Sequence, residues 1–145
     1  MGLQATNAGI DFQQRVSAFM MILMEFEIDI SMVLQLNSNG KIVELNFEAC
    51  ENIDDLVMTL ESGGKIYFQM KRTISLSESE DSEFYGVCTQ FVKQYLTQNS
   101  SDLAYILCTR SEASSTITVK LKRILEGIRL AQDFKIISDL NKEEK

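Results

Sequence analysis

The chain has 145 residues, of which 45% are hydrophobic, enough for one compact domain with a sizeable core. Histidine is absent, which excludes Ser-His and Cys-His catalysis and His-ligated zinc. Lysine and arginine number 14 against 21 acidic residues, and the net charge of −7 excludes a surface that attracts nucleic acid over its whole extent. A phosphate-binding role therefore needs a local basic face.

The N-terminal segment lacks the charged and apolar regions of a secretory signal peptide, and no apolar run approaches the roughly 20 residues of a membrane span. Three cysteines, Cys50, Cys88 and Cys108, are scattered among apolar residues. This spacing indicates neither a disulfide framework nor a zinc site, and we expect core thiols. The sequence therefore predicts a cytoplasmic protein without membrane contact.

Residues 10 to 25 carry apolar side chains at steps of three and four, which predicts an amphipathic helix that begins at Asn7 or Asp11. Its apolar stripe comprises Phe12, Val16, Phe19, Met20 and Leu23. An apolar stretch of ambiguous type, 29–36, follows the helix and leads to a turn signal at 37–40.

Three strands are predicted in the middle of the chain. Residues 41–48 alternate apolar and polar side chains, as in a half-buried strand. Its expected inward positions are Val43, Leu45 and Phe47. Residues 54–60 and 65–73 are two further β-type runs, and the Gly-Gly pair between them suits the positive φ angles of a tight hairpin turn. Together the three runs predict a meander.

The second half of the chain predicts a helix at 75–98, a strand buried on both faces at 102–110 and a basic helix at 114–134. The expected inward side chains are Phe84, Val87, Cys88, Phe91 and Tyr95 on the first helix and Ile117, Leu121, Ile124, Leu125 and Ile128 on the second. Acidic residues near the start of the first helix complement its dipole. The element order predicts an α/β fold with helices flanking a mixed sheet of about four strands.

Polar side chains interrupt the middle of the third predicted strand. Because side chains alternate along a strand, Gln69 and Lys71 share one face with Tyr67. If the hairpin pairs this strand with the preceding one, Asp55 lies beside Gln69 and Lys71. The pairing therefore predicts that a carboxylate, an amide oxygen and an ammonium group meet at one end of the sheet.

This grouping suits metal-assisted hydrolysis of a phosphodiester. Asp55, the Gln69 side-chain oxygen and the Met70 backbone carbonyl are oxygen ligands of the kind that Mg²⁺ or Mn²⁺ takes. Lys71, about 6–7 Å along the strand from Gln69, would position a water molecule or stabilise developing negative charge. None of these roles needs histidine.

The segment "NIDDLVM" followed by "IYFQMK" resembles the signature of the PD-(D/E)xK nuclease superfamily, in the Gln-x-Lys form common among Mrr-like restriction endonucleases. Further short motifs extend the likeness: "GIDFQQRVSAFMMIL" near the start, "DDL", "QMK", "CTR", and "SS" before the last basic helix. Over roughly residues 8–130 they resemble the double-stranded-DNA endonuclease domain at the N-terminus of bacterial anti-phage effectors.

The resemblance implies a restriction-endonuclease-like three-layer sandwich and a magnesium-dependent DNA endonuclease that is activated by oligomerisation or by a fused sensor domain. It implies that Asp55, Gln69 and Lys71 are the catalytic residues. It also implies that Asp55, Gln69 and the Met70 backbone carbonyl are the metal ligands. Many superfamily members carry a Glu on the first helix, where this chain has Gln13 and Gln14. Additional candidate metal ligands are therefore Glu48, Glu51, Asp54 and Gln13.

Basic residues that could contact DNA phosphates are Arg72, Arg110, Lys120, Lys122, Arg123 and Arg129. The alternative for the basic helix is an ordinary solvated face. A rival function is a nuclease-like fold without catalysis that acts as a nucleic-acid-binding or oligomerisation module. We expect one domain over 1–145, in which 131–145 form a C-terminal helix or a linker to a further domain.

Overall fold

The structure is a computed structural model that describes residues 3–36, 40–48, 52–53, 55–97 and 104–130. Its elements, in chain order, are α1 (Leu3–Glu25), α2 (Ile30–Leu34), β1 (Ile42–Phe47), β2 (Leu56–Leu60), β3 (Lys65–Met70), α3 (Glu83–Thr97), β4 (Ala104–Cys108), the π-helix η1 (Thr116–Leu121) and α4 (Lys122–Leu130). The ambiguous stretch after the first helix forms α2. The expected C-terminal helix or linker at 131–145 lies outside the described residues.

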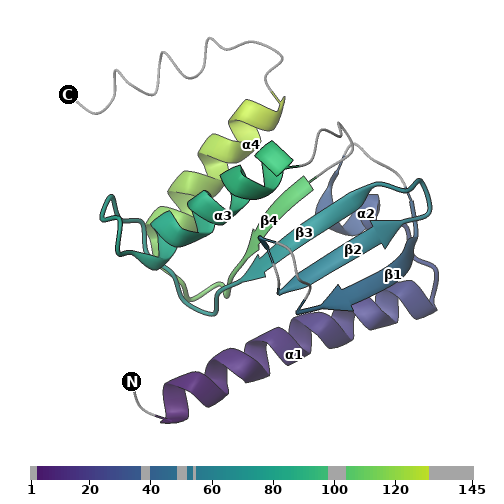
Figure 1. Ribbon diagram of the computed structural model, residues 1–145, viewed down its shortest axis with the longest axis horizontal. Helices are drawn as coiled ribbons and strands as arrows, with labels where there is room; N and C mark the ends of the chain where they lie inside the picture. Colours follow the sequence, from purple (N-terminus) through teal and green to yellow (C-terminus); the bar gives the residue numbers. More distant parts are fainter. Residues whose placement is uncertain (1–2, 37–39, 49–51, 54, 98–103, 131–145) are drawn as a thin grey trace.

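The four strands form one mixed sheet in the order β1-β2-β3-β4, which confirms the predicted α/β class (Figure 1). β1 with β2 and β2 with β3 pair antiparallel, whereas β3 with β4 pair parallel. A parallel pair needs a crossover connection, and α3 lies in that connection. As a consequence, β3 and β4 end at the edge of the sheet where β2 begins.

The hairpin between β2 and β3 forms as predicted. Leu56 pairs with Phe68, and the Leu60 N–H donates to the Gly64 carbonyl at 2.8 Å to close the turn. Gly63 has a φ of 84°, a conformation that glycine adopts without a steric cost. The turn residues therefore determine the register that later sets Asp55 against the end of β3.

One face of the sheet packs on α1 and α2. Ile66, Phe68 and Met70 alternate along β3 and join a buried cluster with Met20 and Leu23 of α1. The remaining buried members of this cluster are Ile30, Ile42, Leu56, Met58 and Leu60. α1 runs as a long helix along this side of the molecule (Figure 1). Its apolar stripe thus covers the sheet, as the sequence predicts for Phe12, Val16, Met20 and Leu23. Phe19 is 46% exposed, and the prediction that it belongs to the inward stripe is wrong.

The opposite face packs on α3 and η1. Tyr67 of β3 lies in a cluster with Val57 of β2, and its ring stacks on Tyr105 of β4 with centroids 5.6 Å apart. A further cluster of Ile74, Val87 and Ile117 joins α3 to η1. Helices therefore cover both faces of the sheet.

β1 departs from its predicted alternation. A bulge shifts the pairing register between Ile42 and Glu44, so that Ile42 and Leu45 lie against the core. Val43 and Phe47 are exposed, and the prediction that they face inward is wrong. The bulge inserts one residue, so that Ile42 rather than Val43 shares a face with Leu45. Phe47 shares the face of Leu45 but is 38% exposed at the end of β1.

α3 also differs from the prediction. It begins at Glu83, so three of the acidic residues expected in the helix, Glu78, Glu80 and Asp81, precede it. Tyr95 is exposed, whereas Gln94 is buried because its Oε1 accepts hydrogen bonds from the Asn52 backbone N–H at 3.1 Å and from Asn52 Nδ2 at 3.2 Å. The paired amide groups offset the cost of burying a polar side chain.

The last two elements are less buried than predicted. Every residue of β4 is half-buried, because β4 lies at an edge of the sheet. Leu125 and Ile128 of α4 are exposed, so their predicted inward orientation is wrong. Among the residues described, we find no helix whose length and apolarity would let it cross a membrane.

The cysteines are only in part the core thiols that the sequence predicts. Cys88 is exposed, whereas Cys108 is half-buried at the end of β4, and Cys50 lies outside the described residues. Burial raises the pKa of the Cys108 thiol, which keeps it protonated and unreactive near neutral pH.

Candidate functional site

Polar and charged side chains that could take part in catalysis lie at one end of the sheet, where its strands start and stop. The carboxyl ends of β3 and β4 meet there with the start of β2, because β2 runs antiparallel to β3 and β4 runs parallel to it. Asp55 directly precedes β2, and one further step of the β2–β3 register sets it opposite Gln69. Lys71 directly follows β3. The structure thus brings together the three residues on which the sequence prediction rests.

Hydrogen bonds from different layers of the fold hold Asp55. Its Oδ2 accepts from the Met70 backbone N–H at 2.5 Å, and its Oδ1 accepts from Gln13 Nε2 at 3.3 Å. The first bond ties the carboxylate to the end of β3, and the second ties it to α1. Because the donors come from rigid elements, they orient the carboxylate before any ligand arrives.

Gln13 acts at this site as a hydrogen-bond donor to Asp55. Its amide nitrogen reaches Asp55, so the structure places it in contact with the candidate site from a point 42 residues earlier in the chain. The neighbouring Gln14 is exposed. The sequence signal for Gln13 was the polar pair at this point of α1, but the identity of its partner depends on how α1 packs.

Gln69 is buried with an unsatisfied acceptor. The residue is 2% exposed, and its Oε1 has no hydrogen-bond partner among the described residues. An unsatisfied buried amide oxygen costs about 1–3 kcal/mol, so native structures seldom contain one without a ligand, an ion or a water molecule as its partner. Gln69 therefore offers an oxygen that is ready to accept a cation or a donor group.

Lys71 combines a fixed backbone with a half-buried side chain. Its N–H donates to the Cys108 carbonyl at 2.9 Å, which extends the β3–β4 pairing by one residue. Its Nζ lies 3.9 Å from Glu83 Oε1 at the start of α3. The side chain borders a depression of about 450 Å³, which is also lined by Glu80, Glu83 and Lys93. The backbone of Lys71 is thus fixed, and its side chain remains partly accessible.

The other candidate ligands contribute less. Glu48 follows β1 as an exposed residue with a φ of 49°, and the predicted ligands Glu51 and Asp54 lie outside the described residues. Within the described ranges, no three acidic or cysteine side chains form a group that could hold a metal ion. Among the described residues, the candidate ligands at this end of the sheet are Asp55 and neutral oxygens such as that of Gln69.

The donor set at the edge fits a hard divalent cation. Carboxylate and amide oxygens are the ligands that Mg²⁺ and Mn²⁺ prefer. The unsatisfied Gln69 Oε1 is a buried acceptor opposite a carboxylate, which is the combination that a cation would satisfy. The residues present therefore fit such an ion, with Asp55 as the anionic ligand of the set.

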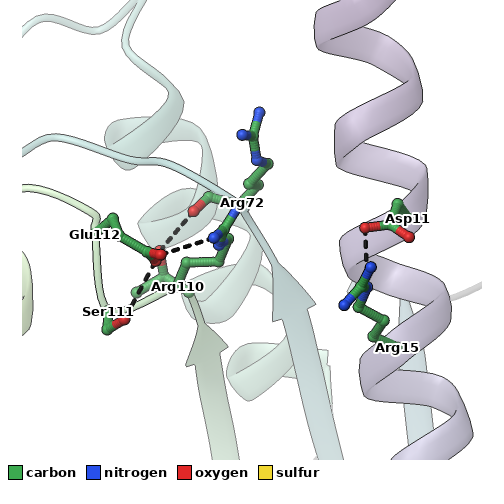
Figure 2. A network of polar contacts seen from close by, with 7 residues as sticks. Asp11, Arg15, Arg72, Arg110, Ser111 and Glu112 are labelled. Atoms are coloured by element: carbon green, nitrogen blue, oxygen red, sulfur yellow. Dashed lines mark hydrogen bonds and ion pairs between the residues drawn. The ribbon is translucent and has the colours of Figure 1, made fainter.

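Two arginines follow the ends of β3 and β4. Figure 2 shows the Arg110 guanidinium turned toward Glu112, while the Arg72 side chain points away from that pair. Arg110 Nη2 lies 2.7 Å from Glu112 Oε1, and the Arg110 N–H donates to the Arg72 carbonyl at 3.4 Å. A backbone hydrogen bond and the Arg110 side chain lower the pKa of Glu112, so its charge neutralises Arg110. Arg72 is the better placed of the two for a phosphate.

The remaining basic candidates lie on η1 and α4. Lys120, Lys122 and Arg123 are exposed, as predicted, and Lys122 Nζ lies 3.8 Å from Glu126 Oε1 one turn later. Arg129 belongs to α4, but its side chain lies outside the description. The exposure of these side chains agrees both with a phosphate-binding face and with an ordinary solvated face.

A second unsatisfied polar atom lies on β4. The Tyr105 hydroxyl is buried without a hydrogen-bond partner among the residues that the structure describes. Burial, and to a smaller extent the nearby Tyr95, raises the pKa of Tyr105, so the hydroxyl stays protonated. Its strand appeared in the sequence as a plain apolar run, which carried no signal for this group.

The comparisons with known proteins give no independent support for the resemblance drawn from the sequence motifs. A comparison of the chain with protein-family models, with curated proteins and with solved structures finds no match.

Proposed function

We propose that the chain is a metal-dependent endonuclease domain that cleaves double-stranded DNA. The observation that carries the proposal is the buried, unsatisfied Gln69 oxygen opposite Asp55, next to Lys71. A strand interior built for stability alone would place an apolar residue at position 69, because an unpaired buried amide destabilises the fold. A buried amide that destabilises the fold is expected at a position that binds a ligand.

Each residue has a distinct role in this proposal. Gln13 and the Met70 N–H orient the Asp55 carboxylate, which with the Gln69 oxygen would hold Mg²⁺ or Mn²⁺. The Met70 carbonyl is a candidate third ligand. When bound, such an ion withdraws charge from a phosphodiester and acidifies water. Lys71 supplies a fixed positive charge beside the phosphate, where negative charge develops during hydrolysis.

The arrangement of the elements supports the finer fold assignment in the same proposal. Helices cover both faces of a mixed sheet, and the candidate residues lie on a hairpin and the strand after it. This agrees with a restriction-endonuclease-like three-layer sandwich. By the same resemblance we propose that the domain serves as the effector of a prokaryotic anti-phage protein in the cytoplasm.

DNA would approach the edge of the sheet through a small number of cations. Lys71 and Arg72 lie at the end of β3, and Arg110 lies at the end of β4. Lys120, Lys122 and Arg123 extend the basic surface along η1 and α4. Because the net charge is −7 and the number of phosphates neutralised is small, binding to DNA through so few cations should be weak.

The test is plasmid cleavage with and without Mg²⁺. Lys71→Ala should reduce the cleavage rate about 100-fold or more, because it removes charge stabilisation of the transition state. Lys93→Ala is the matched control, since Lys93 is an exposed residue of α3 that lines the same depression. Circular dichroism checks that both variants fold. Full activity in a folded Lys71→Ala protein would contradict the assignment.

An inactive nuclease-like fold that binds nucleic acid or mediates oligomerisation is the second candidate. It is favoured by the Glu83 carboxylate 3.9 Å from Lys71 Nζ and by the absence, among the described residues, of a group of three acidic or cysteine side chains that could hold a metal ion. Thermal unfolding with Mg²⁺ or Mn²⁺ discriminates the two, because an ion that binds the folded state raises the unfolding temperature. No shift up to about 10 mM ion would favour the inactive module.

A further inference from the structure

The outer side of α1 carries apolar side chains that the fold does not cover. Phe19 is 46% exposed, Ile22 is 52% exposed and Phe26, which continues the helical hydrogen bonding through its N–H to the Ile22 carbonyl, is 72% exposed. α1 lies along the outside of the molecule in Figure 1, with the sheet on its other side. A helix with apolar side chains on its outer as well as its inner side normally has a partner on each.

The exposed residues form one stripe with symmetric spacing. Arg15, Phe19, Ile22 and Phe26 follow one another at steps of four, three and four, so they lie on one side of the helix. We call these four residues the α1 seam. Reversing the chain direction leaves this spacing unchanged. Two antiparallel copies would therefore set Phe19 against the Ile22 of the other copy, and Arg15 against its Phe26.

The charges along α1 favour the same arrangement. No charged residue lies between Arg15 and Glu25, which are of opposite sign and are both exposed. Arg15 Nε already donates to Asp11 Oδ2 of its own helix at 2.9 Å, and both side chains remain exposed (Figure 2). An antiparallel pair would in addition bring each Arg15 beside the Glu25 of the other copy and over its Phe26 ring, where a guanidinium binds favourably. A parallel pair would instead place like charges together. The uncharged middle also lets copies of a protein with net charge −7 approach without local repulsion.

We propose that the α1 seam is the interface between two copies of this chain, paired antiparallel about a twofold axis. A twofold interface requires a surface that is complementary to itself, and the α1 seam meets this condition. One helix pair buries less than about 1,200 Å², which is the range of weak, reversible complexes. The pairing does not depend on the proposed nuclease activity.

Sedimentation velocity on the 145-residue chain tests the pairing. Between about 1 μM and about 1 mM, the wild-type protein should pass from monomer to dimer. Ile22→Glu should raise the dissociation constant at least about tenfold, because it places a charge at the centre of the α1 seam. Leu96→Glu is the control, since Leu96 is 76% exposed on α3 and receives the same change.

A charge exchange tests the antiparallel direction. Arg15→Glu and Glu25→Arg should each weaken dimerisation, and the double variant should restore it, because each copy would again meet an opposite charge on the other. Circular dichroism confirms folding in each case. A wild-type protein that stays monomeric throughout, or dimerisation that Ile22→Glu leaves unchanged, would overturn the proposal. A double variant weaker than both single variants would overturn the antiparallel direction.

Discussion

Gln69 illustrates how one side chain can oppose stability and support a function. Its amide is 2% exposed with an unsatisfied oxygen, yet it lies in the middle of the sheet, where an apolar residue would cost less. Asp55 and Lys71 carry charge at the same edge but are hydrogen-bonded or ion-paired within the chain. Substitutions at position 69 can therefore show whether the buried amide binds a ligand or only weakens the packing of the sheet.

Gln69→Glu should strengthen Mn²⁺ binding about tenfold, because it replaces a neutral oxygen ligand with an anionic one of the same size. Without metal, the same variant should unfold at a lower temperature, since it buries an uncompensated charge. Gln69→Ala should weaken binding. Calorimetry and thermal unfolding measure both effects, with the exposed Gln14→Glu as control. Equal Mn²⁺ affinity in the wild type, Gln69→Glu and Gln69→Ala would show that the residue is not a ligand.

Gln13→Ala should lower Mn²⁺ affinity or kcat about tenfold, because partners that orient a ligating carboxylate typically contribute that much. The expected cause is the loss of the 3.3 Å hydrogen bond to Asp55. Gln14→Ala changes the adjacent exposed amide and should have no effect. Separate values of kcat and KM, together with metal titrations, provide the readout. If the two alanine variants behave alike, Gln13 does not position Asp55.

Among the elements, α2 depends on the residue that caps its N-terminus. Asp29 is the N-cap, and its Oδ1 accepts from the Ser31 N–H at 2.8 Å and from the Gly40 N–H at 3.4 Å. The bond to Gly40 joins the helix to the residues just before β1. Hydrogen bonds with Ser31, and more weakly with Gly40, lower the pKa of Asp29 below its ordinary value of 3.8.

Because the folded-state pKa of Asp29 is lowered, its ionised form adds stability above about pH 4, and this contribution is lost as the pH falls through the folded-state pKa. Asp29→Asn keeps an N-cap without the charge, so its stability should fall less in acid than that of the wild type. Asp29→Ala should be less stable at every pH. Urea unfolding at about pH 6 and about pH 3 measures these differences. Parallel pH profiles for the wild type and Asp29→Asn would contradict the role of the carboxylate.

At the scale of the whole molecule, an acidic domain with few site cations should act poorly as a monomer. Pairing two copies doubles the phosphate contacts, and cutting both strands of a duplex needs two sites or two successive nicks. Specific activity should therefore rise with protein concentration and rise further when the chain is fused to an inducible dimeriser. A flat profile with no gain on forced dimerisation would show that one domain is already complete or is not a nuclease.

Much of the fold could be predicted because its signals are local. The Gly-Gly turn, the polar interruption of β3 and the apolar stripe of α1 each act over a few neighbouring residues. Predictions failed where distant contacts decide. The bulge in β1, the buried Gln94 and the exposure of Leu125 depend on which elements pack together, and a single sequence carries no direct record of that packing.

The candidate site divides in the same way. The absence of histidine, the net negative charge and the alternation that puts Gln69 and Lys71 on one side of the strand can all be read from the residues. The packing of distant elements is what brings Gln13 to Asp55, buries the Gln69 oxygen without a partner among the described residues and places Glu83 near Lys71. The physical reason is that alternation follows from the backbone of one strand, whereas burial and partners depend on contacts between elements that are far apart in the chain.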